Sequence, residues 1–216
     1  MADTTVNGIT VMQADMLRPF GGRWTARVEF DGGLSEGDAA ALRLLGVDYT
    51  GTVREAGVIG ARGYAMIVGG SGGYDRSLDS KHYRYSPTVG AVVNDIATEC
   101  GETLSPTADA NLLAQTLTSW TRTTGTAGDM LAELAEYIGA SCRVLADGTT
   151  WIGAETWPAV SADWILIGGS PDAGRITIAA EVASYAPGDS LDGMRIATVK
   201  HIVTPQQSRS VLRLMR

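Results

Sequence analysis

The side chains that most often do chemistry in proteins are sparse in this sequence. It holds two cysteines, Cys100 and Cys142, and two histidines, His82 and His201. None of the four has a second Cys or His close by, so neither a four-thiolate metal or iron–sulfur site nor a histidine cluster for metal catalysis is supplied. The sequence lends no support to a disulfide between Cys100 and Cys142, and the residues predict no metal site.

Three acidic side chains lie close together, at Asp129, Glu133 and Glu136. As paired carboxylates they could do acid–base chemistry. On a helix, however, they lie off the apolar face, and acids early in an amphipathic helix are normally a solvated face stabilised by the helix dipole. No Ser/His/Asp or Cys/His arrangement with suggestive spacing accompanies them. We therefore expect no catalytic residue, no cofactor site and no enzyme.

One glycine-rich segment, Gly69-Gly70-Ser71-Gly72-Gly73, is a candidate for cradling phosphates. A phosphate-binding loop needs either a following Gly-Lys-Ser/Thr or a G-x-G-x-x-G spacing that opens a helix, and neither is present. A flexible connector to the next module is the expected structure.

The composition is that of a folded, turn-rich protein. Glycine takes 27 of 216 positions, or 12.5%, against about 7% in average usage, without a G-X-Y period. Many turns imply many short strands, in one large β-rich domain or two small ones. The net charge of −7, from 17 basic and 24 acidic side chains, predicts no specific binding to a nucleic-acid backbone.

The beginning of the chain has neither a basic start nor an apolar signal region, and no window approaches 18 consecutive apolar residues. These patterns predict no membrane-spanning segment and no export by a standard signal from the cytoplasm in which the chain is made.

The first 70 residues show the alternation of half-buried strands. A long loop around Pro19 is expected between the first two of them. The segment 35–45 stays open between helix and strand. Its Ala/Leu content favours a helix, but Gly37 and Gly46 flank it closely, and a strand at 41–45 is the alternative. The predicted strands are 9–12, 24–30, 47–54 and 63–69.

Two helices with recognisable capping residues are predicted next. In the first, Ser86 is the expected N-cap with Pro87 in the first turn, and Gly101 ends the helix. In the second, Thr126 and Asp129 form a cap pair and Gly139 follows the last turn. The predicted apolar faces are Val89, Val92, Val93, Ile96, Ala97 and Cys100 in the first helix, and Ala127, Met130, Leu131, Leu134, Ala135 and Ile138 in the second.

The rest of the chain is predicted to form strands joined by turns, including two hairpins. Asp147-Gly148 between two alternating runs predicts a tight turn with positive φ at both residues. Further strands are expected at 164–167, 175–182, 194–202 and 210–215, with a turn at Ala186-Pro187-Gly188-Asp189 and a closing hairpin through 204–208.

The order of these parts resembles the baseplate hub proteins of long-tailed bacteriophages, the late-control-type hubs and their relatives in contractile injection systems. The resemblance covers roughly residues 75–216. It is carried by Tyr83–Pro87 before a Val-rich helix, Trp120–Ala127 opening a second helix, the hairpin at 144–153, Ala186-Pro187-Gly188, the strand Met194–His201 and the final strand Ser210–Leu214.

The resemblance implies an α+β, mainly β fold, with tail-tube-like β-barrel domains and a small two-helix plus hairpin module. The expected domains are a β-barrel part at 1–74, the helix-helix-hairpin module at 75–158, and C-terminal strands at 159–216 that complete a β-barrel. The chain is shorter than the larger members, so an elaborated second barrel or fused spike is expected to be missing. Two cysteines are too few for the iron–sulfur tail-tip type.

The implied function is that of a structural hub. Three copies form a ring that joins the tail tube to a spike or fibre, with the distal tail or tube protein and the tape measure as further partners. The chain is then part of the virion tail, assembled in the host cytoplasm, and the genome passes through the ring. A carbohydrate-binding or adhesion β-module is the alternative, followed by a tail-associated cell-wall hydrolase.

Aromatic side chains are the expected anchors of such a ring, because Trp and Tyr are enriched in interface hot spots. The five tryptophans are Trp24, Trp120, Trp151, Trp157 and Trp164. Packing in the core explains Trp120 and Trp151 as well as a role in an interface does. For Trp157, in a loop beside Pro158, an exposed or interfacial position and a packed one both stay open. The net charge also predicts an acidic channel lining, which would keep DNA from adhering to the wall.

Overall fold

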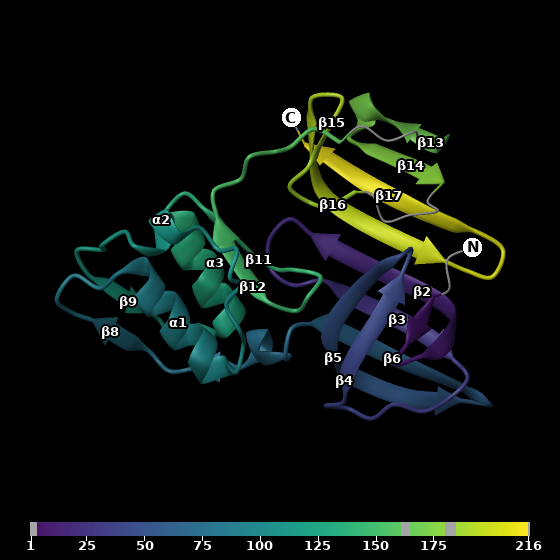
Figure 1. Ribbon diagram of the computed structural model, residues 1–216, viewed down its shortest axis with the longest axis horizontal. Coiled ribbons are helices and arrows are strands. Elements are labelled where there is room, and N and C mark those ends of the chain that lie inside the picture. The colour runs from purple at the N-terminus through teal and green to yellow at the C-terminus, as the bar shows by residue number, and fades with distance from the viewer. Residues whose placement is uncertain (1–3, 161–164, 180–184, 216) are drawn as a thin grey trace.

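A computed structural model describes residues 4–160, 165–179 and 185–215. Strands account for 49% of the residues and helices for 16%, which confirms the predicted mainly β, α+β fold. Figure 1 shows a barrel at the N-terminal end, a helical part beside it, and a C-terminal sheet lying against the barrel. None of the helices in the described part of the chain is long and apolar enough to span a membrane.

Six strands form a closed barrel. They are β1 (Thr5–Val6), β2 (Ile9–Pro19), β3 (Thr25–Phe30), β4 (Ala39–Leu44), β5 (Val47–Ile59) and β6 (Arg62–Gly69). The order runs β1-β4-β5-β6-β3-β2, and β1 closes the ring because it pairs with both β2 and β4. The barrel interior is apolar, with Phe30, Leu42 and Ile67 all fully buried.

The segment that the sequence left open between helix and strand is a strand, β4. Ala40, Leu42 and Leu44 are buried, whereas Ala39, Ala41 and Arg43 face solvent. The helix propensity of alanine and leucine is a weak preference, and here pairing with β1 and β5 on both sides outweighs it.

The long loop predicted around Pro19 is wrong, because β2 continues as a strand to that residue. Its second half pairs on one side with β3 and on the other with β16 (Met194–Val203). Pro19 is tolerated because it is the last residue of the strand, where no further ladder hydrogen bond is required of it.

The C-terminal strands extend the barrel sheet outward from β2 (Figure 1). They follow the order β16, β17 (Ser208–Met215), β14 (Arg175–Ala179), β13 (Ile165–Ser170), with β15 (Ser190–Leu191) beside β16 and a 3₁₀ turn at Pro171–Ala173. The predicted closing hairpin is confirmed by the pairing of β16 with β17. The predicted strand residues Trp164 and 180–182 lie outside the described residues.

Two hydrophobic clusters stabilise the chain. One runs from the barrel into the helical part, and a separate one lies under the C-terminal sheet around Ile176, Ile196 and Leu212. The six-strand ring closes without the C-terminal strands. The domain boundaries at 1–74, 75–158 and 159–216 stay a prediction.

The helical part holds α1 (Val89–Cys100), α2 (Ala110–Leu113) and α3 (Ala127–Tyr137), with two short strand pairs, β7 (Ser77–Leu78) with β10 (Gly125–Thr126) and β8 (Lys81–Tyr83) with β9 (Trp120–Arg122). The predicted apolar faces are confirmed, since their residues are buried except for the half-buried Ile138.

The predicted start of the first helix is wrong. Thr88, not Ser86, is the N-cap, and its side chain accepts a hydrogen bond from the Ala91 amide at 3.1 Å. Ser86 instead has a positive φ of 52°. The second start is confirmed, because the Thr126 hydroxyl accepts from the Asp129 amide.

The predicted hairpin consists of β11 (Ser141–Val144) and β12 (Thr150–Gly153). Of its two turn residues only Gly148 has positive φ, at 83°. The hairpin is therefore confirmed, but the expected turn with positive φ at both residues is wrong. The turn is closed by a hydrogen bond from the Gly148 amide to the Leu145 carbonyl at 3.1 Å.

Candidate assembly surfaces

The glycine-rich loop 69–73 does hold an anion, but the anion is a side chain of the protein. The buried carboxylate of Glu102 accepts hydrogen bonds from the amides of Ser71 at 3.0 Å and Gly73 at 2.7 Å. A Cβ at Gly70 would lie 2.4 Å from this carboxylate. The loop is therefore pinned to the segment after α1, and the predicted flexible connector is wrong.

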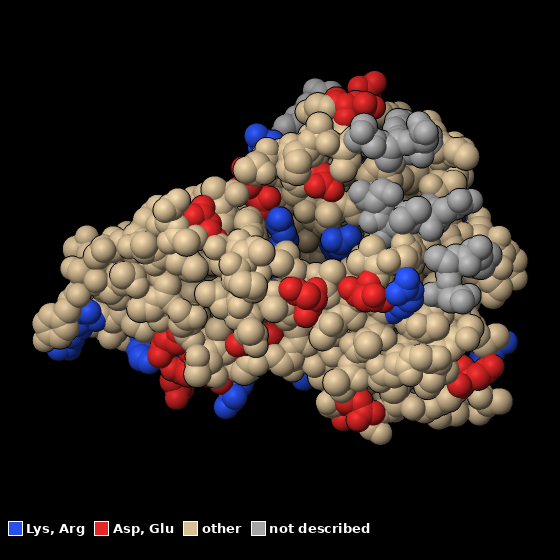
Figure 2. Space-filling model, in the orientation of Figure 1, with Lys and Arg blue, Asp and Glu red and all other residues tan. Residues whose placement is uncertain are grey.

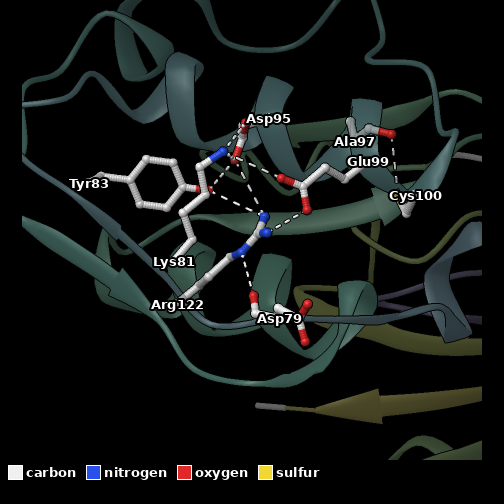
Figure 3. Close-up of polar contacts among 8 residues, drawn as sticks. All are labelled: Asp79, Lys81, Tyr83, Asp95, Ala97, Glu99, Cys100 and Arg122. Atoms are coloured by element: carbon white, nitrogen blue, oxygen red, sulfur yellow. Dashed lines mark hydrogen bonds and ion pairs between the residues drawn. The ribbon is translucent and has the colours of Figure 1, made fainter.

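The densest charged cluster joins α1 to the β8–β9 strand pair (Figure 3). Arg122, almost fully buried, forms ion pairs with Glu99 and, at 3.4 Å, with Asp95. Lys81 contacts the Asp95 carboxylate at 2.6 Å, and the Tyr83 hydroxyl donates to it. These contacts satisfy the charges internally, so the cluster acts as a structural clamp.

The pKa directions in the clamp agree with this role. Burial alone would raise the pKa of Asp95, but the hydrogen bonds from Lys81 and Tyr83 outweigh it and hold that pKa below its ordinary value. Burial would lower the pKa of Arg122, but the bond to Glu99 raises it. Both groups stay charged near neutral pH and stabilise each other.

The cysteines and histidines are not brought together. Both cysteines are free and buried, and burial raises the pKa of Cys142 to about 11. His82 is exposed and bonds Thr121. His201 is fully buried, with its Nδ1 2.7 Å from the Ser210 hydroxyl. Within the described residues, no three metal-ligating side chains gather into a group that could hold an ion.

The acidic residues Asp129, Glu133 and Glu136 are exposed on α3, as predicted. Of the tryptophans, Trp24 and Trp120 belong to the core. Trp157 is half-buried; it stacks on Phe20 with ring centroids 4.9 Å apart and lies under the Arg195 guanidinium. Trp164 lies outside the described residues.

A cavity of about 230 Å³ lies where the barrel, the β11–β12 hairpin and the turn at 186–189 meet. Figure 2 shows basic side chains in the hollow at this junction, and the cavity is lined by Arg18 and Arg143 together with Glu155 and Asp189. Arg143 pairs with Glu155 and lies 4.4 Å from the Trp151 ring centroid. The lining thus holds two cationic and two carboxylate side chains.

A further solvent-facing feature is the outer side of the extended sheet, called the open face below. One row of directly paired residues crosses eight strands: Glu55, Met66, Arg27, Asp15, Ile202, Arg209, Ala179 and Ile165. Sequence reasoning could not find this face, because the row joins residues from both ends of the chain.

Each end of the open face is a strand edge that no described strand pairs with, called a free edge below. At one end, β5 pairs with β4 only as far as Thr52, which leaves the far side of residues 54–59 unpaired by any described strand. At the other end, β13 pairs only with β14 among the described strands. Large apolar side chains are exposed at both edges, with Val58 and Ile59 65% and 74% exposed and Ile165 and Ile167 72% and 54% exposed.

The fold is shared with tail proteins of known structure. A 43 kDa tail protein of prophage MuSo2 from Shewanella oneidensis superposes with a TM-score of 0.72 at 11% identity, covering 99% of this chain and 97% of that one. A tail protein from Neisseria meningitidis MC58 gives a TM-score of 0.68 at 11% identity, covering 99% and 95%.

A third structure with this fold is the c3393 protein of E. coli, described as a component of the type VI secretion system with structural similarity to the T4 bacteriophage tail proteins gp27 and gp5. Its TM-score is 0.71 at 9% identity, covering 98% of this chain and 76% of that one. No protein-family model matches the sequence, and no curated protein is detectably similar to it. At these identities the similarity establishes the fold.

Proposed function

We propose that this chain is a structural component of a bacteriophage tail, and specifically a hub at the baseplate or tail tip. In this role three copies form a ring that joins the tail tube to a spike or fibre. Its neighbours are the distal tail or tube protein, the spike or fibre, and the tape measure protein.

The observation that carries the proposal is the correspondence of almost the whole chain to almost the whole of two tail proteins, one of them from a prophage, at TM-scores of 0.72 and 0.68. A match over part of a chain could reflect a shared module, whereas these matches include the barrel, the helical part and the C-terminal sheet together. The likeness to a type VI secretion component extends the same fold to a related machine.

The polar clusters favour a structural role over an enzymatic one. The Arg122 clamp and the Glu102 carboxylate are both occupied by internal partners, and catalytic groups need access to a substrate.

The channel lining is a separate question. The open face carries cations such as Arg27, Lys200 and Arg209 beside the carboxylates of Asp15 and Glu55, so its charges are mixed. The acidic lining of the channel stays a prediction.

The experiment is deletion of the coding sequence from its native genome, with complementation from a plasmid. The proposal predicts particles with absent or incomplete tails, and restoration of complete tails by the plasmid. Normal tails in the deletion strain would overturn it. Normal tails with lost adsorption to host cells would instead indicate the adhesion module.

A further inference from the structure

We propose that the two free edges of the open face pair with each other between copies of this chain, so that residues 54–59 of β5 in one copy add to β13 in the next. This inference names the contact by which the proposed ring would close. It rests on the proposed function, because the ring itself is part of that proposal. The partner at each edge is a second copy of the same chain.

The first argument is that both edges belong to one sheet. The cross-strand row from Glu55 to Ile165 shows that β5 and β13 are the two ends of the same eight-strand face. Figure 1 shows both strands in the right-hand half of the view, with β13 near the top and β5 in the lower part. No described strand of the same chain pairs with either edge, whereas the next copy can supply a partner for each.

The second argument is that the edges match in length and character. The unpaired part of β5 spans 54–59, and β13 spans Ile165–Ser170. Each is six residues long, and each exposes large apolar side chains. Soluble edge strands normally carry charges or proline; β13 has neither, and the β5 edge has charges only at its start, at Arg54 and Glu55. Pairing would cover part of the exposed surface of Val58 and Ile59 on one edge and of Ile165 and Ile167 on the other.

The third argument concerns symmetry. The two edges are different surfaces, so their contact is heterologous, and each copy that joins leaves one free edge of each kind. Such a contact repeats until the rotation between copies closes a ring. A contact of β13 with a second β13 would instead stop at a dimer.

The test uses the full chain with two double variants and sedimentation across a concentration series. Ile165→Lys with Ile167→Lys blocks the β13 edge, and Val58→Lys with Ile59→Lys blocks the β5 edge. Tyr85→Lys with Tyr137→Lys is the matched control, because these side chains are 95% and 65% exposed in the helical part. Melting curves confirm that each variant folds.

The native chain and the control are expected to form a closed oligomer, whereas each edge variant alone is a monomer of 22.6 kDa. An equal mixture of the two edge variants is expected to stop at a dimer of 45.2 kDa, twice the chain mass. This happens because each variant retains one functional edge. The dimer also shows that both variants remain folded.

A native chain that stays monomeric at all concentrations overturns the inference, and so does an oligomer that both edge variants still form. Failure here is separable from failure of the tail role. Defective tails in the deletion strain together with a monomeric chain would reject only the edge pairing. Edge-dependent oligomers together with normal tails would reject only the tail role.

Discussion

The carboxylate of Glu102 accepts the amide hydrogen of Gly73 at 2.7 Å, inside the protein and 29 residues away in the chain. A loop whose sequence has the glycine content of a phosphate-binding loop thus binds an anion that the fold itself supplies. The pairing joins the end of the barrel to the end of α1, because the loop follows β6 and Glu102 follows Gly101 at the helix C-cap.

Replacing Glu102 with alanine is expected to lower the free energy of unfolding by about 2–3 kcal/mol, because buried amides lose a charged acceptor. Chemical denaturation of the native chain and the variant measures this loss. Glu133→Ala, on the exposed face of α3, is the control and is expected to stay within about 0.5 kcal/mol. Equal losses for the two variants would show that the loop does not depend on Glu102.

Replacing Arg122 with alanine is expected to cost about 2 kcal/mol. A fully buried pair broken on one side costs about 3–5 kcal/mol, and the loss is smaller here because Asp95 and Glu99 keep 27% and 37% of their side chains exposed. The matched control is Arg43→Ala, which removes the exposed pair with Asp48 and is expected to cost less than about 1 kcal/mol. Similar losses in both denaturation curves would contradict the clamp.

Gly148→Val is expected to lower the melting temperature, with a cost of about 2 kcal/mol or more. The φ of Gly148 is 83°, which a β-branched residue tolerates badly. A Cβ there would also lie 2.8 Å from the Thr50 carbonyl oxygen. Gly33→Val is the control, because Gly33 has ordinary φ and open space around its Cβ position. An unchanged melting temperature for Gly148→Val would argue against the hairpin turn.

Stability is expected to fall in acid partly through His201. Burial, with a smaller contribution from Arg18, lowers its pKa from 6.5 to about 3. Between these two pH values the unfolded chain binds a proton that the folded chain does not. His201 therefore lowers the unfolding free energy by about 1.4 kcal/mol for each pH unit of acidification from 6.5 to about 3.

The measurement is unfolding free energy against pH for the native chain, His201→Gln and the exposed control His82→Gln. The native and control curves are expected to descend together, and His201→Gln is expected to lack this part of the slope. Three parallel curves would mean that His201 takes up its proton without a cost to the fold.

Local patterns predicted the helical part well. The apolar faces of α1 and α3, the Thr126 cap and the β11–β12 hairpin depend on residues a few positions apart, so periodicity, cap and turn chemistry identify them. The expected Ser86 cap and the expected positive φ at Asp147 were wrong. The element that stayed open, β4, was decided by its neighbours β1 and β5 rather than by its own composition.

The features that bear on function depend on distant residues and could not be found in the same way. Asp95 and Glu99 are one helical turn apart, which is a signal for a shared face, but nothing in the sequence connects them to Arg122. The two free edges of the open face likewise follow from strand order. The family resemblance, carried by the order of parts, predicted the fold where individual motifs did not.

The most direct test of the proposed role is electron cryomicroscopy of tails purified from the native particle, with mass spectrometry of the same sample. The account predicts this chain in the particle, as a ring of three copies at the end of the tail tube. Tails that are complete but contain no copy of the chain would contradict it.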